Sequence, residues 1–218
     1  MSAQPLEPAR RPSLAERRKS ETRMEIARTA ARLFAEHGTS AVTADQIAAE
    51  SGVALRTFYR YCGTKEEAVE PMLAAGAQRW LADIATGPHR LPTLSEFEAA
   101  AVASMTPVDG HDDLQITRGL LHAMDTDPRL RAVWQRINLE AERELYRILM
   151  ELTGPQADPV ELRIRAAAAA GAIRVALELW AAEDSVAAGE DASPAGLVIR
   201  CMRTFASGQI SDMPRSSS

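Results

Sequence analysis

The sequence predicts an all-α protein, and three observations support this. Alanine, which favours helices, occupies 40 of the 218 positions, whereas aromatic residues make up 5%. Apolar residues recur at helical spacing along most of the chain, and no segment shows the alternation typical of a β-strand. The 12 glycines and 12 prolines stand mostly at the ends of these periodic segments, where they interrupt helices.

The helix boundaries follow from capping patterns and breakers. Ser13 and Glu16 form a capping box that opens the first helix, and Gly38 closes it in the left-handed conformation. Thr43 and Thr64 each begin a further helix, with Gln or Glu three residues later. The expected helices cover about residues 13–37, 43–51, 54–61, 65–86, 93–105, 112–125, 128–153, 159–183 and 194–208.

Proline at position 71 falls within the fourth expected helix, about seven residues from its start. It cannot donate a backbone hydrogen bond there, so we expect a kink. Two interpretations stay open: a pivot between two parts of the molecule, or a static bend.

The charge is divided unevenly along the chain. Residues 1–65 carry 11 Lys and Arg against 7 Asp and Glu, a net charge of +4. The remaining residues carry 14 against 23, a net charge of −9, which gives −5 for the whole chain. A basic N-terminal part is typical of a polyanion-binding face, and the acidic remainder keeps the protein in solution.

Several function classes find no support in the sequence. It lacks a nucleophile elbow, a phosphate-binding loop, a dinucleotide fingerprint and a C-x-x-C pair, so we expect no catalytic site, cofactor or metal. No apolar run is long enough to cross a membrane, and the residues MSAQPLEPARRPS lack the apolar stretch expected of a secretory signal. The two cysteines, Cys62 and Cys201, favour a reduced, cytoplasmic setting, with Cys62 as a small core residue.

The most informative segment is residues 43–65, TADQIAAESGVALRTFYRYCGTK. It places two short helices around Gly52, the layout of a helix-turn-helix. The second helix concentrates arginine, threonine and tyrosine, side chains that contact base edges and phosphates, within about two turns. Ala54 stands where a capping residue is favoured, which costs the second helix about 1 kcal/mol.

The chain resembles the TetR family of bacterial transcriptional regulators. The resemblance is carried by LFAEHG at the end of the first helix, by TADQIAAESGV, and by TFYRYCGTKEEA. It implies a homodimer with two helix-turn-helix heads and a helical body that binds an inducer. In similar proteins the ligand shifts the fourth helix and DNA is released.

The resemblance also assigns DNA contacts residue by residue. Thr43, Tyr59, Tyr61 and Lys65 match phosphate contacts, Leu55 and Arg56 match positions that reach base edges, and Thr57 matches another contact position in the same turn. Arg56 is the candidate for guanine readout, because bidentate arginine–guanine pairing is the commonest specific contact. For Arg60, the interpretations that stay open are a DNA contact, a side chain that is only solvated, or one that pairs with a nearby acid. Arg10 and Arg11 could form a minor-groove arm or belong to a disordered tail.

The body supplies two further sets of candidates. Residues that could line an apolar ligand pocket are Trp80, Phe97, Met105, Arg118, His122, Met124 and Trp134. Small and apolar residues of the last two helices predict a four-helix dimer interface, because small side chains allow close helix approach; the candidates are Ala169, Ile173, Leu177, Trp180, Val198, Met202 and Phe205.

We therefore expect a disordered arm (1–12), a helix-turn-helix DNA-binding domain (13–65), a ligand-binding and dimerisation domain (66–210) and a flexible tail (211–218). The expected function is a dimeric repressor that binds a pseudo-palindromic operator and is released by a small hydrophobic or amphiphilic inducer. An activator with the same head, or a helical enzyme or carrier, are the alternatives. The enzyme would need a polar catalytic cluster, which the sequence does not offer.

Overall fold

The structure is a computed structural model that describes residues 13–105, 113–182 and 193–207. This part of the chain contains nine α-helices, one short 3-10 helix and no strand, as the sequence predicted. The elements are α1 (Leu14–His37), α2 (Ala44–Glu50), α3 (Leu55–Tyr61), η1 (Glu67–Val69), α4 (Glu70–Ala85), α5 (Leu94–Ser104), α6 (Asp113–Ala123), α7 (Pro128–Thr153), α8 (Pro159–Ala182) and α9 (Pro194–Ala206). The expected N-terminal arm with Arg10 and Arg11 and the expected tail, 211–218, lie outside the described residues.

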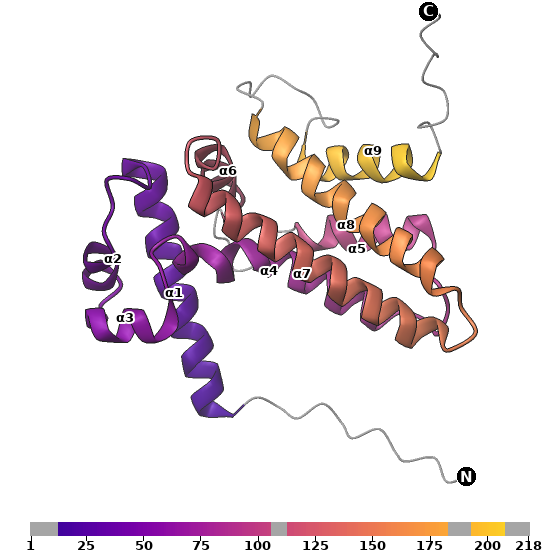
Figure 1. Ribbon diagram of the computed structural model, residues 1–218, viewed down its shortest axis with the longest axis horizontal. Coiled ribbons are helices and arrows are strands. Elements are labelled where there is room, and N and C mark those ends of the chain that lie inside the picture. The colour runs from indigo at the N-terminus through magenta and orange to yellow at the C-terminus, as the bar shows by residue number, and fades with distance from the viewer. Residues whose placement is uncertain (1–12, 106–112, 183–192, 208–218) are drawn as a thin grey trace, which may run out of the picture.

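Helices α1 to α3 form a head at one end of the molecule, and α4 leads from it into the body (Figure 1). The long helices α7 and α8 run side by side through the body, and α4 packs against α7. Helix α9 packs on both α8 and α5. Helix α6 contacts α1 as well as α8, so it joins the head to the body.

The predicted capping explains where several helices begin. Ser13 Oγ accepts the amide N–H of Glu16, and Glu16 Oε2 accepts that of Ser13 at 2.6 Å, a complete capping box. Thr43 also caps α2, but its expected partner Gln46 donates its side-chain amide to Glu50. Ala54 makes no side-chain cap, as expected for alanine.

The expected fourth helix begins later than its sequence pattern indicates. Thr64 Oγ1 does accept the amide N–H of Glu67, but this bond closes a turn that precedes the 3-10 helix η1, and α4 starts only at Glu70. Pro71 therefore lies in the first turn of α4. A proline there breaks no helical hydrogen bond, because first-turn N–H groups have no intrahelical acceptor. The prediction that Pro71 lies about seven residues inside the fourth helix was wrong.

Two hydrophobic clusters fill the interior. The first unites buried residues of α1, α2 and α3 with Leu120, Leu121 and Met124 around α6 and with Leu130 and Val133 of α7. The second occupies the rest of the body between α4, α5, α7, α8 and α9. The core of the head thus continues into the body, across the domain boundary expected at residue 65.

Other sequence expectations concern cysteines, metals and membranes. Cys62 is buried, and burial raises the pKa of its thiol to about 11, which makes it an unreactive core residue. Among the described residues no group of three His, Cys, Asp or Glu side chains is placed to hold a metal ion. None of the described helices combines the length and the apolar character needed to span a membrane.

Candidate nucleic-acid interface

The helix-turn-helix predicted for residues 43–65 is present, and its turn depends on one glycine. Gly52 has a φ of +69°, a conformation that side chains disfavour, and the following amide of Val53 donates to the carbonyl of Ala48. Ile47, Ala48 and Phe58 are buried in the first hydrophobic cluster. This packing fixes α3 against α1 and α2 and decides which side of α3 faces solvent.

The solvent side of α3 carries most of the predicted DNA contacts. Leu55, Arg56, Tyr59 and Arg60 are exposed, with 55% of the Tyr59 surface accessible, and Thr57 is half-buried. Arg56 makes no hydrogen bond or ion pair with other described residues, so its guanidinium is available to a partner. A single helix turn thus presents one free arginine beside a tyrosine, a combination that suits major-groove and phosphate contacts.

Tyr61 and Arg60 interact with one another. The guanidinium of Arg60 lies 5.1 Å from the centre of the half-buried Tyr61 ring, within cation–π range. Within the described part of the chain Arg60 pairs with no carboxylate, so the alternative of an acid-paired arginine finds no support.

Lys65 differs most from its predicted role. Its Nζ donates to the carbonyl oxygens of Thr39 at 2.5 Å and Val42 at 2.7 Å. These bonds hold the loop between α1 and α2, the loop that leads to Thr43 at the exposed start of α2. Lys65 therefore has a structural role that the sequence pattern did not reveal, in addition to the predicted phosphate contact.

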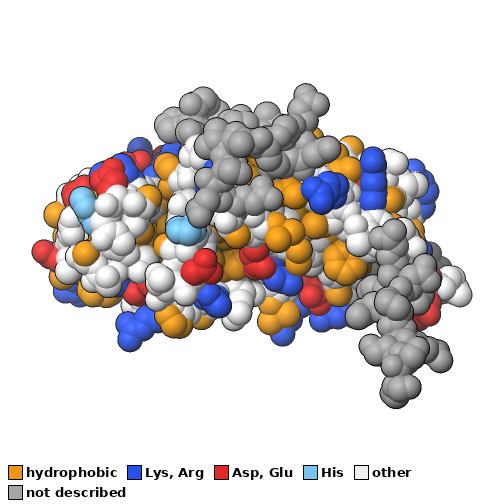
Figure 2. Space-filling model, turned by 90° about the horizontal axis from the view of Figure 1, so that it is seen from above, with side chains coloured by type: hydrophobic (Ala, Val, Ile, Leu, Met, Phe, Trp, Pro, Cys, Tyr) orange, Lys and Arg blue, Asp and Glu red, His pale blue; other side chains and the backbone are white. Residues whose placement is uncertain are grey.

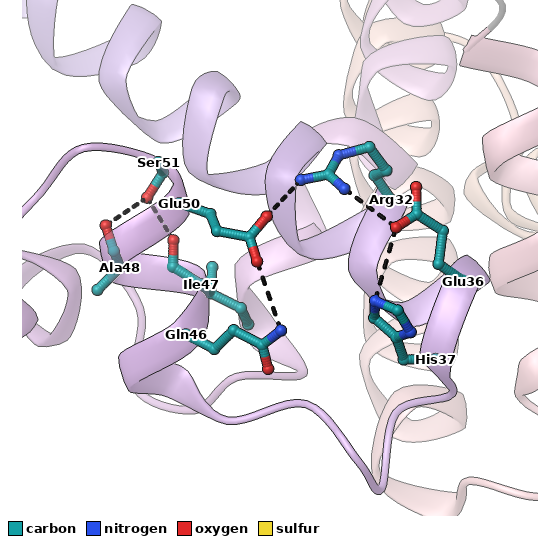
Figure 3. A network of polar contacts seen from close by, with 8 residues as sticks. All are labelled: Arg32, Glu36, His37, Gln46, Ile47, Ala48, Glu50 and Ser51. Atoms are coloured by element: carbon teal, nitrogen blue, oxygen red, sulfur yellow. Dashed lines mark hydrogen bonds and ion pairs between the residues drawn. The ribbon is translucent and has the colours of Figure 1, made fainter.

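A network of polar contacts fixes α2 to α1 on the solvent side. Arg32 of α1 donates to Glu50 of α2 at 2.6 Å and to Glu36 at 3.1 Å, and Glu50 also accepts from Gln46 (Figure 3). Each exposed pair contributes little alone, about 0–1 kcal/mol. Together they restrict the rotation of α2, on which the position of α3 depends.

A second polar link connects the head to the body. Asp127 caps α7 by accepting the amide N–H groups of Arg129 and Leu130. Burial opposes its charged form, but hydrogen bonds from the Thr39 hydroxyl and from these amides, with the charge of Lys65, outweigh burial and lower the pKa of the carboxyl. The start of α7 is thereby tied to the loop before α2.

Comparison with known proteins decides the family. Residues 26–70, which contain the helix-turn-helix, match the model of bacterial regulatory proteins of the tetR family. The chain is 31% identical over 153 residues to the HTH-type transcriptional regulator TcmR of Streptomyces glaucescens, covering 67% of each protein.

The chain belongs to the TetR family.

As a TetR-family protein it is a DNA-binding transcriptional regulator and not an enzyme. A solved structure of a TetR-family regulator from Mesorhizobium loti superposes with a TM-score of 0.51 at 15% identity, covering 87% of this chain and 97% of that one. At that identity the likeness shows the fold alone. GusR of Salmonella enterica gives a TM-score of 0.49 at 17% identity, covering 86% and 94%.

The predicted ligand-pocket residues are divided among several sites. Trp80, Met105 and Trp134 line a cavity of about 320 Å³ between α1, α4, α6, α7 and α8. His122, Met124 and Trp134 border a groove of about 860 Å³ between α7 and α8. Phe97 lines a smaller hollow near α9, and Arg118 lies over the Trp180 ring at 5.6 Å.

The cavity contains residues that sequence reasoning missed. Met24 and Arg28 of α1 and Arg79 of α4 line it, and so do Ile173 and Leu177, which were predicted at the dimer interface. The spacing of Met24 and Arg28 by four residues was a usable signal, because it places both on one helix face.

The predicted dimer residues mostly face inward. Trp180, Val198 and Met202 are buried within the single chain, and Ala169, Ile173 and Leu177 are half-buried. Only Phe205, at 45% exposure, offers a large surface. The outward side of α8 instead carries an apolar stripe at intervals of three or four residues: Val160, Ile164, Ala168, Gly171, Val175 and Leu179. In the single chain the exposed apolar side of α8 is therefore not the side that carries the predicted dimer residues.

Proposed function

We propose that the protein is a dimeric, cytoplasmic repressor that binds a pseudo-palindromic operator and dissociates from it when a small apolar or amphiphilic ligand binds. In this proposal residues 13–65 bind DNA, and residues 66–210 bind the ligand and form the dimer. The observation that carries it is the cavity of about 320 Å³, because its wall includes Met24 and Arg28 of the head as well as α4 and α6. A ligand there would contact both parts at once.

Few packing contacts separate the cavity from the proposed DNA-binding helices. Met24 and Arg28 lie on α1, against which α2 packs, and α3 in turn packs on α2. Leu114 and Thr117 of α6 also line the cavity, and further along α6 Leu120 is buried in the core shared with the head. A ligand that displaced α6 or α4 would therefore change the position of α3 through packed side chains.

The outward stripe on α8 supports dimerisation. Val160 and Ile164 are more than 60% exposed, and Phe205 of α9 lies beside Ile164 in the same hollow. Hydrophobic side chains gather over the body on the face seen in Figure 2. Small residues at 168 and 171 would let two copies of α8 approach closely, and the buried stripe would stabilise the pair. Two heads on one axis suit half-sites about 10 bp apart, or a multiple of that spacing.

Selection of bound DNA from a random pool tests the proposal. We expect enrichment of a pseudo-palindrome, and its loss when an apolar ligand is present. Failure to enrich any palindrome would contradict the proposal that a dimer binds the operator. A promoter–reporter assay with the selected site then separates the repressor from the activator, because a repressor lowers expression in the absence of ligand.

A further inference from the structure

The cavity of about 320 Å³ is lined mainly by apolar side chains, but not uniformly. Met72, Met105, Ile137 and Ile173 form much of its wall. Its volume is at the lower end of the roughly 300–1,000 Å³ typical of small-molecule pockets, so its occupant is small. Such pockets usually select ligands through a few polar groups, and α4 contributes two neighbouring ones here, Arg79 and Trp80.

The first of these groups is the indole of Trp80. The side chain is 2% exposed, and its Nε1–H has no hydrogen-bond partner among the described residues. A buried donor without a partner is rare, because it has lost its bond to water. Trp134, which lines the same cavity, differs, since its Nε1 donates to Glu178 at 2.9 Å.

The second group is the neighbouring Arg79. Its Nε and Nη2 both donate to the carbonyl oxygen of Ser104, at 3.2 and 2.6 Å, which leaves Nη1 outside these bonds. In the described part of the chain Arg79 forms no ion pair with a carboxylate, and no Asp or Glu lines the cavity. At α4 the cavity therefore combines apolar walls with the charge of Arg79 and the unpartnered N–H of Trp80.

We infer that the ligand is a small apolar monocarboxylate, whose carboxylate accepts hydrogen bonds from Trp80 Nε1–H and Arg79 and whose apolar part packs against Met72, Met105 and Ile137. The inference rests on the proposed function for the role of this cavity. A planar carboxylate matches the guanidinium fork, and an apolar surrounding strengthens the charge-assisted bonds. A neutral ligand of the same shape would leave Arg79 without a counter-charge.

Calorimetric titration of the purified full chain tests this with pairs of probes that differ only in charge. The pairs are 2-naphthoate and 2-naphthamide, 4-biphenylcarboxylate and its amide, and decanoate and decanamide. At least one acid is expected to bind once per chain and about tenfold more tightly than its amide, as for loss of a charge-assisted hydrogen bond. Amides that bind as tightly as every acid, or a failure of all three acids to bind, would overturn the inference.

Variants locate the carboxylate. Trp80→Phe removes the unpaired N–H together with part of the indole volume, so some thermal stability is lost, but affinity for the acid should fall about tenfold more than affinity for the amide. Arg79→Gln should have a similar effect on the acid and little on the amide. The matched control is Arg131→Gln, because Arg131 Nε and Nη2 donate in the same way to the carbonyl of Met124 but lie outside this cavity. An equal loss in the control would refute the assignment.

Operator release, measured separately by fluorescence anisotropy, distinguishes this inference from the proposed function. Acids that bind but leave DNA bound would uphold the ligand class and contradict the inducer role. Amides that bind and release DNA as well as the acids would uphold the inducer role and contradict the ligand class.

Discussion

The ammonium group of Lys65 lies 2.5 Å from the carbonyl oxygen of Thr39, 26 positions earlier in the chain. This bond joins the end of the helix-turn-helix to the loop after α1. It gives the lysine a role in the stability of the head, separate from any contact with phosphate.

Replacement of Lys65 by methionine is expected to destabilise the protein by about 1–3 kcal/mol, because charged donors to buried carbonyls contribute this much. Thermal unfolding followed by circular dichroism measures the effect. The affinity of the protein for DNA should fall about equally for specific and random sequences, since the whole head becomes less stable. An unchanged melting temperature would contradict the structural role.

Arg56→Ala should act on sequence choice and leave stability unchanged. Arg56 is exposed and makes no hydrogen bond or ion pair with other described residues, so its removal should cost the fold little. If it reads a guanine, discrimination between the operator and single-base variants falls by about 1–3 kcal/mol. Competition binding at a fixed salt concentration measures this discrimination. If it is unchanged in the variant, Arg56 does not contact a base.

The contact between α6 and α1 offers a graded test of communication between body and head. A β-carbon at Gly119 would lie 3.5 Å from Cβ of Ala35, an ordinary contact. Gly119→Ala should therefore bind DNA normally and gain up to about 1 kcal/mol of stability from helix propensity. Gly119→Leu should push α6 from α1 and weaken operator binding in the absence of ligand. Equal DNA affinity in both variants would argue against this route.

The link between Asp127 and Thr39 predicts a pH dependence. The folded state lowers the pKa of Asp127, so its contribution to stability is present above about pH 4, the ordinary carboxyl value, and is lost as the pH falls through the lowered folded value. Asp127→Asn should therefore be less stable than the parent at pH 7, and the difference should shrink below pH 4. Chemical denaturation across pH 2–7 measures this; a constant difference would contradict it.

The dimer face can be tested by charge insertion. Ile164→Arg places a charge in the exposed apolar stripe of α8 and should convert the dimer to a monomer. Leu14→Arg is the matched control, because Leu14 is 66% exposed and Ile164 is 63%, and Leu14 lies at the far end of α1. Light scattering at micromolar concentration reads the mass, and an unchanged mass for Ile164→Arg would place the interface elsewhere.

Much of the fold could be predicted from local patterns, for specific reasons. Ser13, Thr43 and Thr93 cap their helices through backbone contacts three residues away, and such signals are contained in the sequence. The exposed side of α3 followed from the single buried position, Phe58. Contacts between distant residues, such as Lys65 with Thr39, had no local signal.

Helix α8 shows where periodicity is insufficient. Its alanine-rich sequence carries apolar residues on both sides, so Ile173 and Ile164 are equally suited to the interior. Only the packing of α7 and α9 decides that Ile173 faces the cavity and Ile164 faces solvent. The position of Pro71 in its helix was predicted wrongly because the Thr64–Glu67 hydrogen bond looks like a helix cap in the sequence, whereas here it closes a turn before a 3-10 helix.

The hydrophobic cluster that runs from α1 into α6 and α7 limits how this regulator can be engineered. A fragment ending at residue 65 would leave apolar side chains such as Ile26 and Phe34 without part of their covering. If the head of this protein were transferred to a relative, the residues of α6 and α7 that face it would have to be transferred as well. They include Leu120, Leu121 and Leu130. DNA specificity and ligand response are therefore not freely interchangeable modules in this chain.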